Sequence, residues 1–236
     1  MTHALLWGAV AASSLLLGTL LAVLRSWPRS WVGLVLAFGA GSLIAGISFE
    51  LYESGHDQAG AGPVAVGLAI GALSYFFADR AVEGWTRKQK GEGSAGVPLA
   101  LGALLDGIPE QAVLGIGLAA GGVINPAMLL AIFVSNLPEA IGSSSDMFKA
   151  GKSRNQVLVL WIAVSALCTV ATIVGFMIAD HAGREVQASI NGFAAGALLV
   201  MLVDSMAPEA QNKAPGIAGL ATALGFAATA ALSLAD

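Results

Sequence analysis

The chain has 236 residues, of which 56% are hydrophobic, only 11% are charged and 30 are glycine. A soluble domain contains about 25% charged residues, so this composition excludes a water-soluble globule and a disordered chain. It also excludes a basic nucleic-acid-binding protein, because phosphate contacts need clustered Lys and Arg and the net charge here is −4. One cysteine, Cys168, excludes an intramolecular disulfide and a thiolate metal cluster. The composition therefore predicts a protein whose main partner is the lipid bilayer.

Apolar segments of about 20 residues, long enough to cross a hydrocarbon core, recur along the chain. We expect an all-α membrane protein, because the alternation over about 10 residues that marks a β-barrel strand is absent. The first segment is interpreted as a retained helix, since no basic stretch precedes it and no small-residue cleavage site is evident. A single transmembrane domain over residues 1–236 is predicted, with a cytoplasmic loop at 80–97 and eight spans at 4–24, 32–52, 63–79, 97–119, 126–148, 157–179, 189–207 and 215–235.

Basic residues mark one side of the predicted bundle. Of the 11 Lys and Arg residues, all but Arg184 follow spans one, three, five and seven. The positive-inside rule places that side in the cytoplasm. The sequence therefore predicts a multi-pass protein of the cell inner membrane with both termini outside.

Two stretches of the chain resemble each other. Residues 38–41 (Phe-Gly-Ala-Gly) in span two match residues 193–196 (Phe-Ala-Ala-Gly) in span seven, and acids follow each stretch. Because spans two and seven cross in opposite directions, the match indicates inverted repeats, with spans 1–3 and 6–8 on either side of spans four and five, a 3+2+3 arrangement. The alternative is a chance similarity between small-residue helix faces that pack closely. Such faces are compatible with a homodimer or with packing inside one molecule.

Spans four and five carry polar motifs at their middles. The motif in span four is Asp-Gly-Ile-Pro-Glu-Gln, starting at Asp106, and the motif in span five is Ser-Asn-Leu-Pro-Glu-Ala, starting at Ser135. In each, the first residue and the glutamate (Glu110 or Glu139) are four positions apart and share one helix face. Each proline removes a backbone donor and pushes on the carbonyl four residues earlier. Kinked helices with free carbonyls and facing acids are typical of an ion site.

Three of these residues are carboxylates near the bilayer centre, namely Asp106, Glu110 and Glu139. Each costs at least about 2.5–3.5 kcal/mol if it remains charged there. No Lys, Arg or His lies in the middle of any predicted span, so the counter-charge is expected to be protons or a bound cation. One alternative is a structural clamp of protonated carboxyls. Another is a membrane enzyme, which we do not expect, because no His-Glu-x-x-His, Gly-x-Ser-x-Gly or similar motif is present.

The paired motifs resemble those of the ZIP (zinc/iron permease-like) family of metal transporters. That family carries His-Asn-x-Pro-Glu-Gly and His-Glu-x-Pro-Glu in the fourth and fifth of eight helices, and Glu110 and Glu139 match its two glutamates. The resemblance extends over nearly the whole chain. It implies transmembrane transport of a divalent first-row metal cation of the zinc, iron and manganese class through a midplane site on spans four and five. The metal would be a substrate, and no resident cofactor is implied.

The chain departs from the family pattern at the histidines. Asp106 and Ser135 stand where the family has histidine, and span six carries no acid or histidine. The ligands that the resemblance leaves all bind through oxygen: Asp106, Glu110, Ser135, Asn136 and Glu139. Oxygen ligands suit magnesium, calcium or manganese, although zinc also accepts carboxylates. The alternative is a ZIP-like fold with a degenerate site that does not transport, or one that handles a harder cation or protons.

Polar residues nearer the ends of the spans are candidates for an entry or exit path. At the outer end of span two they are Glu50, Glu53 and Asp57, and toward the cytoplasm they are Ser143, Asp146, Asp204 and Glu209. Acids at an outer vestibule would draw cations in. Simple solvation at the membrane surface is an equally good explanation for single charges of this kind.

Overall fold

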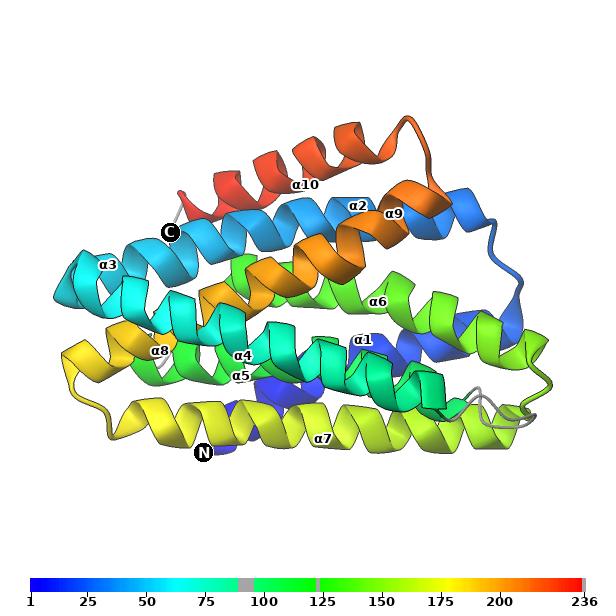
Figure 1. Ribbon diagram of the computed structural model, residues 1–236, viewed down its shortest axis with the longest axis horizontal. Coiled ribbons are helices and arrows are strands. Elements are labelled where there is room, and N and C mark those ends of the chain that lie inside the picture. The colour runs from blue at the N-terminus through cyan, green and yellow to red at the C-terminus, as the bar shows by residue number, and fades with distance from the viewer. Residues whose placement is uncertain (89–95, 122–123, 235–236) are drawn as a thin grey trace.

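The computed structural model describes residues 1–88, 96–121 and 124–234. These residues form a bundle of helices that lie along roughly one direction, and no strand occurs among them (Figure 1). They make up eight continuous helical segments: α1 (Thr2–Leu24), α2–η1–α3 (Arg29–Ala45, Gly46–Glu53 and Ser54–Ala59), α4 (Ala61–Lys88), α5 (Gly96–Gly121), α6 (Pro126–Lys149), α7 (Arg154–Asp180), α8–η2–α9 (Arg184–Met201, Leu202–Met206 and Ala207–Lys213) and α10 (Ala218–Ser233).

Six of these segments are long and apolar enough to cross a membrane: α1, α2–η1–α3, α4, α6, α7 and α8–η2–α9. The other two are α5, of 26 residues, and α10, an apolar helix of 16 residues. The predicted all-helical, multi-pass membrane class is therefore confirmed. The count of eight spans stays a prediction.

The helices differ in how much of their surface the bundle covers. The segments α2–η1–α3, α6 and α8–η2–α9 are more than half buried, whereas α1, α4 and α7 lie on the outside. The outer helices expose large apolar side chains such as Leu6, Phe77 and Val159. Exposed apolar side chains on helices of this length are what a lipid-facing surface requires. The inner helices are therefore the ones that can hold polar groups away from lipid.

Helices extend into both ends of the predicted cytoplasmic loop at 80–97, whose side of the membrane stays a prediction. Helix α4 continues to Lys88 and α5 begins at Gly96, and residues 89–95 lie outside the described ranges. Span seven also extends further than predicted, because α9 continues to Lys213. Hydropathy marks where an apolar run ends, whereas a helix ends only where its backbone hydrogen bonds end, so a polar extension beyond a span is invisible to it.

The tightest helix pairs come in corresponding sets. Helix α2 packs on α10 as α4 packs on α8, and α1 packs on α6 as α5 packs on α7. Between α2 and α10, a side chain at Gly41 would overlap the carbonyl oxygen of Thr222, and one at Gly225 would overlap that of Phe38. Glycine is needed at these crossings because the two backbones touch.

The same arrangement recurs between α4 and α8. A side chain at Gly196 would overlap the carbonyl oxygen of Leu68, and one at Gly71 would overlap that of Phe193. Gly196 and Gly41 are the last residues of the two similar stretches in the sequence. The stretches that resemble each other thus make equivalent backbone contacts with their neighbouring helices.

Each of the two similar stretches is followed by a π-helical segment. These segments are η1, which contains Glu50, and η2, which contains Ser205. A π turn inserts an extra residue into a helix and is frequent at functional sites. Nothing in the sequence predicted these turns. They change which side chains face the interior at the ends of both inner helices.

Candidate metal site

A cavity of about 10 Å³ lies between the inner helices and is lined by acids from three elements. Asp106 and Glu110 come from α5, Glu139 from α6 and Glu209 from α9, and the wall is completed by Leu36, Met201, Ser205 and Met206. The structure thus brings together the three acids predicted at the centre and one acid predicted on the exit path. A space of this size admits a water molecule or an ion and excludes an organic substrate. We refer to it as the acid cavity.

Glu110 is the most deeply buried of these acids, with 2% of its surface exposed. Ser135 donates from Oγ to Oε1 at 3.1 Å, and Asn136 donates from Nδ2 to Oε2 at 2.7 Å. Asn136 Nδ2 also contacts the carbonyl oxygen of Ile132 at 2.9 Å. Hydrogen bonds of this kind to a carboxylate are short and strong. Ser135 and Asn136, predicted as metal ligands, therefore hold the carboxylate of Glu110 in this structure.

The amide nitrogen of Asn136 is hydrogen-bonded to residues that the structure describes, whereas its amide oxygen is not. It is buried and has no hydrogen-bond partner within the described part of the chain. A buried carbonyl oxygen without a partner is costly and rare in native proteins. It is an available acceptor beside Glu110, and a bound cation would satisfy it.

Asp106 is held by two residues that the sequence analysis did not identify. The hydroxyl of Tyr75 on α4 donates to Oδ1, and Ser205 on η2 donates from Oγ to Oδ2 at 3.3 Å. Tyr75 is one of two tyrosines in the chain and sits inside an apolar span, where its hydroxyl needs a polar partner. That requirement was a usable signal. The sequence contains no comparable signal for Ser205, because its orientation depends on the π turn of η2.

Glu139 differs from the other two central acids. It lines the acid cavity with Asp106 and Glu110, but it has no hydrogen bond to any described residue. Pro109 and Pro138 directly precede Glu110 and Glu139, inside α5 and α6. Both oxygens of Glu139 are thus available to a cation.

The acids share the cavity without forming a closed chelate. Within the described ranges, no three His, Cys, Asp or Glu side chains are arranged to hold one metal ion as they stand. Asp106 is held by Tyr75 and Ser205, whereas Glu110 is held by Ser135 and Asn136. Binding of a metal by all the central acids would require them to move toward one another.

A basic residue, Lys213, lies at the edge of the site, although it is not in the middle of a predicted span. Its side chain is only 12% exposed and forms an ion pair with Glu209. Hydropathy predicts only that Lys213 follows span seven, because the apolar run ends earlier. Since α9 continues the helix, the lysine is instead carried back against the bundle.

At the end of the bundle that is predicted to face outward, one of the three predicted entry residues lies in a cavity. Glu50 accepts a hydrogen bond from Asn125 Nδ2, and it lines a cavity of about 190 Å³ together with Ser54 and Asn191. Glu53 and Asp57 are exposed at the surface. Of the three, Glu50 is thus the one that lines a described cavity, and its role as an entry group stays a prediction.

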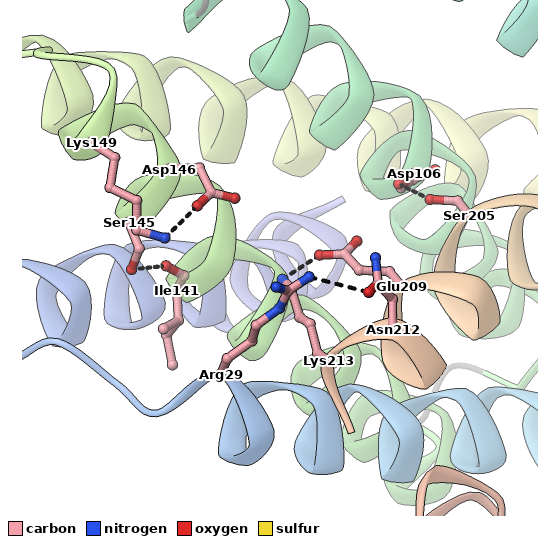
Figure 2. A network of polar contacts seen from close by, with 10 residues as sticks. All are labelled: Arg29, Asp106, Ile141, Ser145, Asp146, Lys149, Ser205, Glu209, Asn212 and Lys213. Atoms are coloured by element: carbon pink, nitrogen blue, oxygen red, sulfur yellow. Dashed lines mark hydrogen bonds and ion pairs between the residues drawn. The ribbon is translucent and has the colours of Figure 1, made fainter. Parts of the chain in front are cut away.

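Toward the end of the bundle that is predicted to face the cytoplasm, a cavity of about 250 Å³ lies beyond the acid cavity. Its lining residues include Arg29, Gly142, Asp146, Lys149 and Lys213, and we refer to it as the vestibule. Figure 2 shows Asp146 paired with Lys149, at 2.9 Å. Of the other predicted exit residues, Ser143 does not line this cavity, and Asp204 is exposed on η2.

The fold and the site define a multi-pass helical membrane protein with an acid-lined cavity in its interior. No family model matches the sequence. A protein of Arabidopsis thaliana named "Putative zinc transporter At3g08650" is 26% identical to this chain over 211 residues, which cover 86% of the chain. The chain spans about a third of the length of that relative, 34%.

Proposed function

We propose that this chain carries a divalent first-row metal ion across the inner membrane, as the resemblance to the ZIP family implies, and that it is not an enzyme. The observation that carries the proposal is the acid cavity, where Asp106, Glu110 and Glu139 converge from two proline-containing helices inside an apolar bundle. Intramembrane acids of this kind mark ion paths. The similarity to a relative named as a zinc transporter supports a metal ion as the cargo.

The contacts of the acids suggest how they bind the ion. Glu139 offers two free oxygens, and Asn136 offers an amide oxygen without a partner. A divalent cation between them would offset the mutual repulsion of Glu139, Glu110 and Asp106. The hydrogen bonds to Glu110 and Asp106 would then be exchanged for bonds to the metal. All five predicted ligands bind through oxygen, which favours manganese relative to a site that contains imidazole.

The helix contacts support an inverted-repeat mechanism for passage. Segments 1–3 correspond to α1, α2–η1–α3 and α4, and segments 6–8 to α7, α8–η2–α9 and α10. Helix α2 then matches α8, and α10 matches α4, so the contact between α2 and α10 is equivalent to the contact between α8 and α4. In the same way, the contact between α1 and α6 is equivalent to the contact between α7 and α5. Repeats related in this way rock about a fixed site, opening it alternately to each side. The cavity at Glu50 and the vestibule then lie on opposite sides of the acid cavity.

The proposed orientation can be tested by cysteine labelling after Cys168→Ala. Gly62 and Gly183 are exposed at one end of the bundle, and Ser26 and Asn155 are exposed at the other. Cysteines at Gly62 and Gly183 should react from outside intact cells. Cysteines at Ser26 and Asn155 should react only after permeabilisation, and the opposite pattern would invert the topology.

A second candidate function is a degenerate site that does not transport, or one that handles protons or a harder cation. It is favoured by the absence of histidine from both motifs and by the hydrogen bonds that satisfy Asp106 and Glu110 without a metal. Under this reading Glu139 is a protonated carboxyl within the bundle.

The deciding experiment is metal uptake into proteoliposomes. Vesicles containing the purified protein should accumulate radioactive manganese, zinc, iron, cobalt or cadmium faster than empty vesicles. Vesicles with the double variant Glu110→Gln/Glu139→Gln should behave like empty ones, because the variant keeps the side-chain shapes and removes both charges. Uptake of none of the five metals would favour the degenerate site.

A further inference from the structure

We propose that Lys213 is a tethered cation that closes the cytoplasmic side of the acid cavity by occupying Glu209. On the proposed function, on which this part rests, the ammonium group must leave Glu209 each time a metal ion passes to the vestibule. Lys213 would thus be a gating residue rather than a metal ligand. The closure is a property of the metal-free protein, so access to the acid cavity can be measured without any metal.

The first support is the position of the ion pair between two cavities. Glu209 lines the acid cavity, whereas Lys213, one helical turn later on α9, lines the vestibule. Figure 2 shows the pair between Asp106 and Ser205 on one side and Asp146 on the other. An ion that moves from the acid cavity to the vestibule would therefore meet this pair.

The second support is the way the lysine is seated among small residues. A Cβ atom at Gly142 of α6 would lie 2.6 Å from Lys213 Nζ, and one at Gly33 of α2 would lie 2.6 Å from Lys213 Cβ. The side chain thus occupies space that two glycines leave between α2, α6 and α9. Gly142 is three residues after Glu139 on α6, so the ammonium group lies beside a part of α6 that is one helical turn from Glu139.

The third support is electrostatic. A lysine that is mostly removed from water needs a counter-charge, and Glu209 supplies it. A divalent cation at Glu139 would repel the ammonium group and compete with it for Glu209. The displaced lysine could pair with Asp146, which lines the same vestibule and whose described partner, Lys149, is exposed.

The closure can be tested with a thiol reporter in the acid cavity. Ser205→Cys in the Cys168→Ala background places a single thiol there, and 2-aminoethyl methanethiosulfonate is applied to inside-out vesicles in the absence of metal. The closed acid cavity is too small for this reagent, so modification in the parent should be slow. Lys213→Ala should raise the rate at least about tenfold, because it removes the side chain between the cavity and the vestibule of about 250 Å³, and with it the positive charge. Lys213→Arg should leave the rate low. An unchanged rate in Lys213→Ala would overturn the proposal.

Lys149→Ala is the matched control. Lys149 lines the same vestibule and also pairs with an acid on its own helix, but its side chain is 77% exposed. If this variant raised the rate as much as Lys213→Ala, the effect would come from the charge of the vestibule, and the proposed gate would be wrong. Gel filtration and far-UV circular dichroism establish that each variant is folded.

Gly142→Ala provides a second route to the same result. The added methyl group would meet Lys213 Nζ, the far end of a flexible side chain, so the lysine should shift while the backbone stays in place. We expect faster modification than in the parent and slower than in Lys213→Ala. No change in this variant or in Lys213→Ala would refute the closure.

Metal competition is measured separately in detergent. Manganese should bind more tightly to Lys213→Ala than to the parent, since Glu209 is freed, and equally to Lys149→Ala and the parent. If Lys213→Ala were labelled faster but bound manganese no more tightly than the parent, the closure by Lys213 would stand and its proposed link to metal passage would be wrong. If the uptake experiment failed, the proposed transport would be wrong, but the labelling rates would still show whether Lys213 closes the acid cavity.

Discussion

The two proline-containing helices carry the same Pro-Glu pair, yet their glutamates have opposite surroundings. Glu110 on α5 accepts hydrogen bonds from Ser135 and Asn136 of α6, and it is almost fully buried. Glu139 on α6 has no hydrogen-bond partner among the residues described for the chain. Helix α6 thus donates to the glutamate of α5, and no described side chain of α5 donates to Glu139.

The reason lies in the two residues at the matching positions of α5. Where α6 has Ser135 and Asn136, α5 has Asp106, which carries no donor when ionised, and Gly107, which has no side chain. A Cβ atom at Gly107 would lie 2.9 Å from the sulfur of Cys168, so that space is already filled. One half of the site is therefore held in place, and the other half is left free for a ligand.

The strongest test of this difference is Glu139→Gln. If the free carboxylate is the main ligand, manganese affinity should fall at least about a hundredfold, equivalent to about 2.7 kcal/mol. The stability of the metal-free protein should not decrease, because no hydrogen bond is lost and an unpaired acid is neutralised. Calorimetric titration and thermal unfolding in detergent measure the two effects.

Glu53→Gln serves as the control for that variant, since Glu53 is exposed at the C-terminal end of η1. It should leave manganese affinity unchanged. Equal affinity in Glu139→Gln and the parent would show that the free carboxylate is not a ligand.

The next test removes the support of the held glutamate. Asn136→Ala should lower manganese affinity about tenfold, as loss of a residue that orients a ligand does. It should also destabilise the metal-free protein by about 1–3 kcal/mol, because Glu110 loses a buried donor. The combination of both losses distinguishes this variant from Glu139→Gln.

Ser144→Ala is the matched control on the same helix. Ser144 is fully buried and donates to Thr19 Oγ1 at 3.2 Å, away from the acid cavity. It should reduce stability without changing manganese affinity. If Asn136→Ala lowered stability alone, the role of Asn136 would be structural.

Asp106→His tests whether the residue that replaces the family histidine faces the metal. An imidazole at this position should raise the ratio of zinc to manganese affinity about tenfold, because nitrogen ligands favour zinc. Competition between the two metals in detergent measures the ratio. An unchanged ratio would show that Asp106 is not a ligand.

The smallest effect is expected for Tyr75→Phe. This variant removes one of the two donors to Asp106 and leaves Ser205 in place. Manganese affinity should change by less than about tenfold, in contrast to Asn136→Ala. Phe76→Leu, on the same helix, should have no effect on affinity. If Tyr75→Phe lowered manganese affinity more than Asn136→Ala, Tyr75 would matter more for the site than Asn136, contrary to this prediction.

The sequence by itself determined the membrane class and the place of the central acids. Long apolar runs require burial in lipid or in the bundle, and a helix keeps residues four apart on one face, so Asp106 and Glu110 had to lie together. The sequence also contains the two similar glycine-containing stretches, and glycine allows the close helix packing that both stretches make. These properties are local, and a single sequence contains them.

Only the tertiary structure decided how the acids are partnered. The donors to Asp106 come from 31 residues before it and 99 residues after it, and the donors to Glu110 come from 25 and 26 residues away. Contacts across such separations depend on how whole helices pack and on the π turn that orients Ser205. The burial of Lys213 has the same origin, since the continuation of α9 and the glycines of two other helices give it its place.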